Sequence, residues 1–112
     1  MSNQIITSEL LTEDPNLIDL IDKFISRLPG MVAAIMKAHE DEDWENFASL
    51  IHQMKGVGGN YGYPKLSDIC FKIEAVVRDK NYAEVKDQLN DFNMMHKSIL
   101  AGSDENHNIA KA

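Results

Sequence analysis

Apolar residues recur at every third or fourth position along almost the whole chain, and this spacing constrains the fold more than any other feature. An α-helix brings residues three and four positions apart onto one face, whereas a half-buried strand requires apolar and polar residues to alternate. We find no convincing alternation of that kind. The spacing therefore predicts an all-α fold built from amphipathic helices.

The first predicted helix starts at Asp14-Pro15. Asp14 can cap a helix, and proline suits the first turn because its missing N–H would be unpaired there anyway. Pro29-Gly30 then interrupts the apolar pattern, which resumes immediately afterwards. Either two helices meet at this point or one long helix kinks. The kink is favoured, because no polar loop separates the two halves.

Further apolar stripes follow, each preceded by its own boundary signal. The next three helices are predicted to begin near Trp44 behind a cap at Asp43, at Tyr63-Pro64, and after residues 79–81. Gly102 is expected to end the last of them. Four amphipathic helices with short connections predict an up-down antiparallel four-helix bundle over residues 14–102. Residues 1–13 are predicted to be an N-terminal segment and residues 103–112 a flexible, polar C-terminal tail.

The formal charge of −7 argues against two classes of partner. Nucleic-acid grooves and anionic membrane surfaces need clustered lysine and arginine, and the chain has 11 of these against 18 acidic residues. The longest apolar run, residues 31–36, is too short to span a bilayer, and the N-terminus lacks the features of a signal peptide. A single cysteine, Cys70, cannot form an internal disulfide. We therefore expect a cytoplasmic monomer that binds neither nucleic acid nor membranes.

Segment 51–62 is unusual because it holds four of the six glycines while the apolar spacing continues through it. Glycine clusters usually mark turns, yet on a helical projection the apolar side chains of this region all share one side. The opposite side carries Glu45, Ala48, Ser49, His52, Lys55, Gly56 and Gly59. A glycine inside a helix costs about 1 kcal/mol relative to alanine, so a helix that keeps several of them needs the bare surface. We infer that His52 points away from the core and that another molecule approaches it closely.

Phosphate-binding loops and metal sites do not fit this pattern. No glycine is followed by lysine and then serine or threonine, and a G-x-G-x-x-G motif starting at Gly56 fails at Tyr61. No two histidines lie three or four positions apart, so no helical metal pair is predicted. Cys70 lies on an apolar stripe and is expected to be buried. The sequence predicts no metal site and no cofactor held by this chain.

The pattern His52-x-x-Lys55-Gly56, followed by Gly62 and Leu66, resembles the signature of histidine-containing phosphotransfer (HPt) domains. These domains are four-helix intermediates of multistep phosphorelays. The pattern alone is short, but its place on the second predicted helix, before further glycines and an amphipathic helix, makes it fairly specific.

The resemblance extends from about residue 14 to residue 100 and implies a function. It implies that His52 accepts a phosphoryl group from a receiver-domain aspartate and passes it to another receiver, while Lys55 offsets the phosphoryl charge. The implied partners are receiver domains of response regulators or of a hybrid sensor histidine kinase, with Mg²⁺ bound on the receiver. One departure from the family is Gly58, where a small side chain such as alanine is frequent; the run Gly58-Gly59 can fray the helix end.

Two other functions remain open at this point. A non-catalytic interaction bundle would dock a partner through the glycine-lined face without chemistry at His52. A hydrolase would use His52 as a general base, but its neighbour Ser49 has no orienting acid beyond Glu45. The chain is too short to add an ATP-binding kinase domain to the bundle, so we expect a phosphocarrier rather than a complete enzyme. The start at Met1 favours a freestanding protein.

Overall fold

The computed structural model describes residues 4–112, and helices make up most of this part of the chain. In chain order the elements are α1 (Leu10–Glu13), the 3-10 helix η1 (Pro15–Leu17), α2 (Ile18–Glu40), α3 (Trp44–Asn60), α4 (Pro64–Arg78), α5 (Tyr82–Ala101) and α6 (Ser103–Lys111). Residues 4–112 contain no strand, so the prediction of an all-α fold is confirmed. None of the helices in this range is long and apolar enough to cross a membrane.

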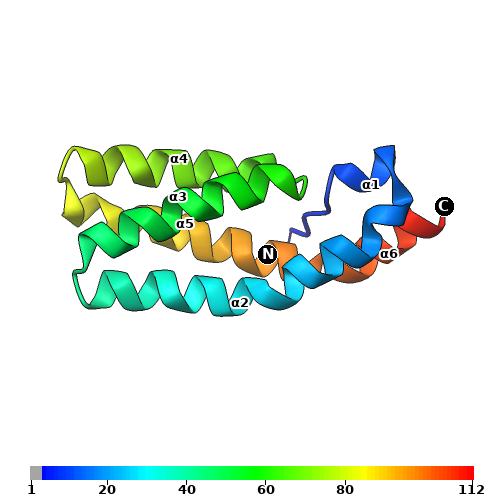
Figure 1. The fold of residues 1–112 in the computed structure, drawn as a ribbon, viewed down its shortest axis with the longest axis horizontal. Helices are drawn as coiled ribbons and strands as arrows, with labels where there is room; N and C mark the ends of the chain where they lie inside the picture. The colour runs from blue at the N-terminus through cyan, green and yellow to red at the C-terminus, as the bar shows by residue number, and fades with distance from the viewer. Residues whose placement is uncertain (1–3) are drawn as a thin grey trace.

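The four longest helices, α2 to α5, lie side by side along the length of the molecule (Figure 1). Helix α3 packs against α2 and α4, and α5 also packs against α2 and α4, so α3 and α5 lie diagonally opposite each other. Each helix buries the apolar stripe seen in the sequence. Phe24 of α2, Phe47 of α3, Cys70 of α4 and Phe92 of α5 all lie in one shared core.

Helix α2 passes through Pro29 without a break, which confirms one long helix and excludes two. Proline has no N–H to donate to the carbonyl one turn earlier, so the helix can bend there at little further cost. Figure 1 shows α2 changing direction part-way along its length. The helix begins at Ile18, later than predicted, because the carboxylate of Asp14 accepts a hydrogen bond from the Asn16 N–H and caps η1 instead.

The C-terminal residues form helix α6, which differs from the flexible tail that the sequence predicts. Asn106 is fully buried: its Oδ1 accepts from the Ser8 N–H at 3.0 Å, and its Nδ2 donates to the Tyr63 hydroxyl at 3.2 Å. Nearby, His107 Nε2 lies 2.8 Å from an Asp22 oxygen on α2. The expectation of disorder rested on polar composition alone, and here the polar side chains have partners elsewhere in the chain.

The N-terminal segment is packed against the same end of the molecule. Ser8 is buried and its hydroxyl donates to the Tyr61 carbonyl at 2.6 Å. Gly62, in the turn between α3 and α4, has φ 83°, a backbone conformation that favours glycine. Gly102 ends α5 as predicted. Its φ is −84°, so it does not adopt the left-handed conformation that usually favours glycine at a helix end. A methyl group there would lie 2.1 Å from the Ile6 carbonyl oxygen, so the glycine allows the N-terminal segment to approach.

Candidate functional site

Helix α3 places His52 on its outward face. The Asp43 carboxylate accepts a hydrogen bond from the Asn46 N–H at 3.3 Å, so the helix begins at Trp44 as predicted. The inward face is buried and consists of Phe47, Ile51, Met54 and Gly58. The His52 side chain is 69% exposed, which confirms that the imidazole points away from the core.

The remaining predicted site residues lie on this outward face, but they do not all approach His52. Glu45, Ser49, Gly56 and Gly59 are exposed, while Ala48 and Lys55 are half-buried. The hydrogen bond of His52 runs to α4 rather than to Glu45 or Ser49. The Ser49 hydroxyl instead accepts from Gln53 Nε2 at 3.5 Å. This arrangement gives no support to a hydrolase in which His52 would activate Ser49.

The site also contains an acidic residue that the sequence analysis did not single out, Glu74 of α4. His52 Nδ1 lies 3.1 Å from Glu74 Oε2. Lys55 Nζ lies 2.6 Å from Oε1, and the two groups form an ion pair. One carboxylate therefore contacts both His52 and Lys55. The sequence did hold one indication that Glu74 lies near α3: it follows buried Cys70 by one helical turn, at the edge of the apolar stripe.

The electrostatics of Glu74 determine which nitrogen of His52 carries hydrogen. Burial opposes ionisation of Glu74, but the contacts with Lys55 and His52 outweigh it and hold the pKa of this carboxyl below its usual value. An ionised carboxylate can only accept hydrogen bonds. In the neutral imidazole, Nδ1 therefore carries the hydrogen and donates it to Glu74, and the lone pair is on Nε2. The site therefore presents an imidazole nitrogen with a free lone pair on an exposed side chain.

The glycines around His52 have two different roles. A methyl group at Gly56 would have no neighbour within 4 Å, and one at Gly59 would make only an ordinary contact at 3.5 Å, with Ser67 Oγ. Both positions therefore leave bare surface, as inferred from the sequence. Gly58 is buried, and a methyl group there would lie 3.0 Å from Ser67 Oγ and 3.2 Å from Leu66 Cγ of α4. It allows α3 and α4 to pack closely, and α3 continues past the two glycines to Asn60.

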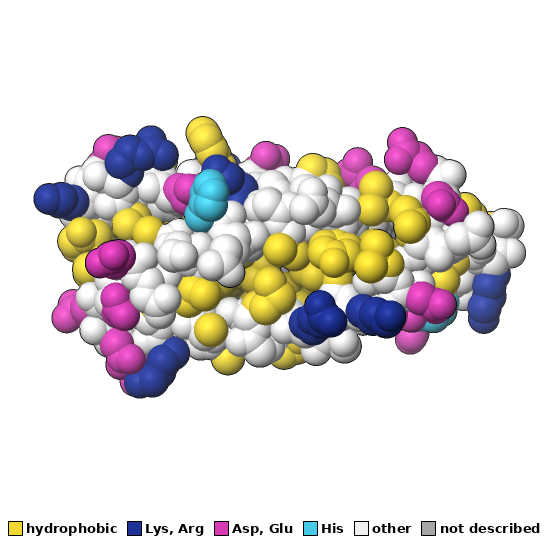
Figure 2. All heavy atoms as spheres, viewed as in Figure 1, with side chains coloured by type: hydrophobic (Ala, Val, Ile, Leu, Met, Phe, Trp, Pro, Cys, Tyr) yellow, Lys and Arg dark blue, Asp and Glu magenta, His cyan; other side chains and the backbone are white. Residues whose placement is uncertain are grey.

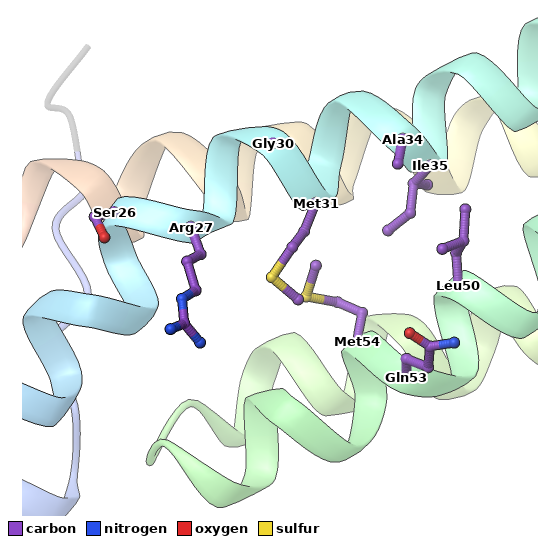
Figure 3. A pocket seen from close by; sticks show the side chains of 9 residues that line it. All are labelled: Ser26, Arg27, Gly30, Met31, Ala34, Ile35, Leu50, Gln53 and Met54. Carbon is purple, nitrogen blue, oxygen red and sulfur yellow. The ribbon is translucent and has the colours of Figure 1, made fainter.

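A groove of about 540 Å³ lies between α2 and α3 beside this face. Its lining is Ser26, Arg27, Gly30, Met31, Ala34, Ile35, Leu50, Gln53 and Met54. Figure 3 shows Met31 of α2 and Met54 of α3 pointing toward one another, with Arg27 on the same side of α2. Figure 2 shows an apolar band on this face and a histidine above it, with basic and acidic side chains alongside. Because Leu50 and Gln53 flank His52 on α3, the groove adjoins the site.

Other reactive groups do not extend the site. Burial raises the pKa of the Cys70 thiol to about 12, so this cysteine is protonated at neutral pH and cannot act as a nucleophile. Within residues 4–112, no three His, Cys, Asp or Glu side chains come together in a group that could hold a metal ion.

Comparison with known proteins identifies one family. A family model described as "Hpt domain" matches residues 19–102, a span that includes His52, Lys55 and Glu74. Searches of curated proteins and of solved structures give no significant match. The matched span covers all of α3 and α4, the two helices that build the site, all of α5, and α2 except for its first residue.

Proposed function

This chain belongs to the Hpt domain family, and on that premise we propose that His52 carries the phosphoryl group. Hpt domains are phosphocarriers that act with receiver domains in phosphorelays. The observation that carries the proposal is the exposed imidazole of His52, whose Nδ1 is held by Glu74 so that the lone pair lies on Nε2. We further propose that α2 to α5 form the up-down antiparallel bundle of the family, and that the protein is a cytoplasmic monomer.

In the proposed reaction, His52 Nε2 attacks the phosphorus of an aspartyl phosphate on a receiver. The Nε2–P bond forms as the bond from phosphorus to the aspartyl oxygen breaks, and the aspartate leaves as a carboxylate. The imidazole becomes positively charged while it holds the phosphoryl group, and Glu74 stabilises that charge through Nδ1–H. In the second half-reaction a carboxylate of another receiver attacks phosphorus, the Nε2–P bond breaks, and His52 returns to its neutral form.

Lys55 would stabilise the negative charge of the phosphoryl group, which is about −1.5 to −2 at neutral pH. Its side chain is 31% exposed and its ammonium already lies beside Glu74, on the same side of the imidazole as α4. The flexible lysine stem allows the ammonium to turn toward an oxygen on Nε2 without leaving the site. We expect Mg²⁺ to be bound by the receiver, so this chain needs no cofactor of its own for the transfer.

The receiver would dock over the outward face of α3. Gly56 and Gly59 leave room for its loops, because neither position has a side chain and both are exposed. Glu45, Ala48 and Ser49 would lie under the receiver one to two turns before His52. The α2–α3 groove would lie at the edge of the same contact area and offers an apolar surface, with Arg27 nearby, to an element of the receiver.

The test is phosphotransfer from a panel of phosphorylated receiver domains. We expect at least one receiver to label the protein, with a label that is acid-labile and base-stable, as phosphohistidine is. The label should be absent in His52→Gln and present in His107→Gln, a matched control on α6, with circular dichroism confirming that both variants are helical. Unlabelled wild-type protein across the whole panel would favour the non-catalytic interaction bundle instead.

A further inference from the structure

Phe71 of α4 is a large aromatic side chain that the fold leaves in solvent. It is 60% exposed, whereas the other three phenylalanines, Phe24, Phe47 and Phe92, are at most 3% exposed. Exposing an apolar ring to water gives no folding free energy, since the stabilisation comes from removing apolar area from water. The packing of the bundle therefore does not account for an aromatic residue at this position.

Phe71 lies directly beside the candidate site. The Lys55 ammonium is 5.7 Å from the centroid of the Phe71 ring, within the range of a cation–π contact. The same ammonium pairs with Glu74, which holds His52. Phe71 and Glu74 are three residues apart on α4, so they are neighbours on the helix surface. The ring thus borders the site on the α4 side, while the α2–α3 groove borders it on the other.

A receiver that reaches His52 has to cover this ring. Phosphoryl transfer needs the phosphorus within about 3–3.5 Å of the attacking nitrogen. A specific protein interface buries about 800 Å² on each partner, an area that extends well beyond the reacting atoms. Phe71 is linked to His52 through only two intervening side chains, those of Lys55 and Glu74. It therefore falls inside the footprint of any receiver in a productive complex.

We propose that Phe71 is a specificity-determining anchor for the receiver, an inference that rests on the phosphotransfer function proposed above. The matching receiver presents an apolar surface beside its phosphorylatable aspartate, on the side that faces α4. A few fully desolvated residues near the centre of an interface contribute most of its binding energy, and aromatic side chains are enriched at such centres. A receiver with a charged residue at that place would bury the charge without a partner, and would be rejected.

The experiment uses the full chain, the receiver that labels His52 fastest in the panel, and phosphoramidate as a small donor. With phosphoramidate the P–N bond breaks, ammonia leaves, and the phosphoryl group passes to His52 Nε2 without any docking. We expect Phe71→Ala to raise the half-saturating receiver concentration about tenfold or more, equivalent to about 1.4 kcal/mol of binding free energy, with Phe71→Leu in between. The maximal transfer rate and the labelling by phosphoramidate should stay unchanged.

Met94→Ala is the matched control, because Met94 is 62% exposed on α5, diagonally opposite α3. It should leave all of these quantities unchanged. An unchanged half-saturating concentration in Phe71→Ala would overturn the anchor while leaving the phosphotransfer function intact. Slower labelling by phosphoramidate would also overturn it, since Phe71 would then act on the chemistry through Lys55. Failure of every receiver to label the wild type would overturn both proposals.

Discussion

The Glu74 carboxylate on α4 holds the His52 imidazole on α3 through a 3.1 Å contact between Oε2 and Nδ1. The two residues are 22 positions apart, and they meet because α3 and α4 pack closely at Gly58. Since Glu74 is held in its ionised form, the contact fixes the imidazole tautomer before any partner arrives. The position of the imidazole lone pair is thus set by a residue outside the helix that carries His52.

We expect Glu74→Ala to change the tautomer of His52 and to slow its phosphorylation. Without the carboxylate, Nδ1–H loses its acceptor, and hydrogen should move in part to Nε2. The rate of labelling by phosphoramidate should fall by about 10-fold to 100-fold, the range found when the group that orients a metal-binding histidine is removed. Nitrogen-15 NMR of the imidazole above pH 7 measures the tautomer directly. Identical spectra in the variant and the wild type would contradict this role of Glu74.

The lowered pKa of Glu74 also predicts that the folded protein loses stability in acid. The pKa of Glu74 is lowered in the folded protein from its usual value of 4.5, so folding favours the ionised form. This contribution to the free energy of unfolding is fully present above the unfolded-state pKa and is lost as the pH falls through the lower folded-state pKa. Urea unfolding of wild type and Glu74→Gln should therefore converge below about pH 4. A stability difference that grows in this range would contradict the assignment.

Removing Lys55 should shift the equilibrium of the phosphoryl group toward the receiver. Two unit charges about 4 Å apart in water attract each other by about 1 kcal/mol, so Lys55→Ala should lower the ratio of phosphorylated protein to phosphorylated receiver about fivefold. Lys55→Arg keeps the charge and should recover most of the loss. The ratio is measured with purified components at equilibrium. Lys97→Ala, an exposed lysine change on α5, is the control and should leave the ratio unchanged.

Alanine at two neighbouring glycines should have opposite effects on stability. Gly56→Ala adds a methyl group in open space and should raise the free energy of unfolding by about 0.5–1 kcal/mol. Gly58→Ala should lower it, because the methyl group would press on the α4 backbone, 3.2 Å from the Ser67 nitrogen. Urea denaturation distinguishes the two.

Gly56→Leu should keep the fold but slow transfer from receivers, because the larger side chain fills the bare surface beside His52. Circular dichroism checks the fold, and an equal transfer rate would show that the bare surface has no role in docking.

Asn106→Ala should destabilise the protein by about 1–3 kcal/mol, because it leaves buried polar partners unsatisfied. The partners are the Ser8 N–H and the Tyr63 hydroxyl. Asn108→Ala is a matched control on the same helix, since Asn108 is exposed and its Nδ2 donates to the exposed side of the same helix, to Glu105 Oε2 at 3.3 Å. It should change stability by less than about 0.5 kcal/mol. Equal effects of the two substitutions in urea unfolding would show that α6 is not anchored through Asn106.

The sequence was sufficient for features that depend on local spacing. Apolar periodicity predicts which side of α3 is buried, and therefore that His52 faces outward. Capping signals at Asp43 and Pro64 predict where α3 and α4 begin, and both helices begin there. The continuous helix through Pro29 follows from the absence of a polar loop. Each of these features involves residues within one or two turns of each other.

The features that sequence reasoning missed depend on contacts between distant residues. Glu74 belongs to the site only because α4 lies beside α3, and no short motif links it to His52. The helical projection places Gly56, but not Gly58, on the outward side of α3. It does not show that Gly58 lets α4 approach, which depends on Ser67 and Leu66. Helix α6 is held by the hydrogen bond that Asn106 Oδ1 accepts from the N–H of Ser8, 98 positions away in the chain.

The packing at the two ends of the chain has a practical consequence for anyone who wishes to shorten this protein. Leu11, Ser8 and Asn106 are buried, yet all three fall outside residues 19–102, where the family match lies. A fragment trimmed to those limits would uncover Tyr63 and the turn that joins α3 to α4. Such a fragment should therefore be less stable than the full chain, because these buried contacts would be lost.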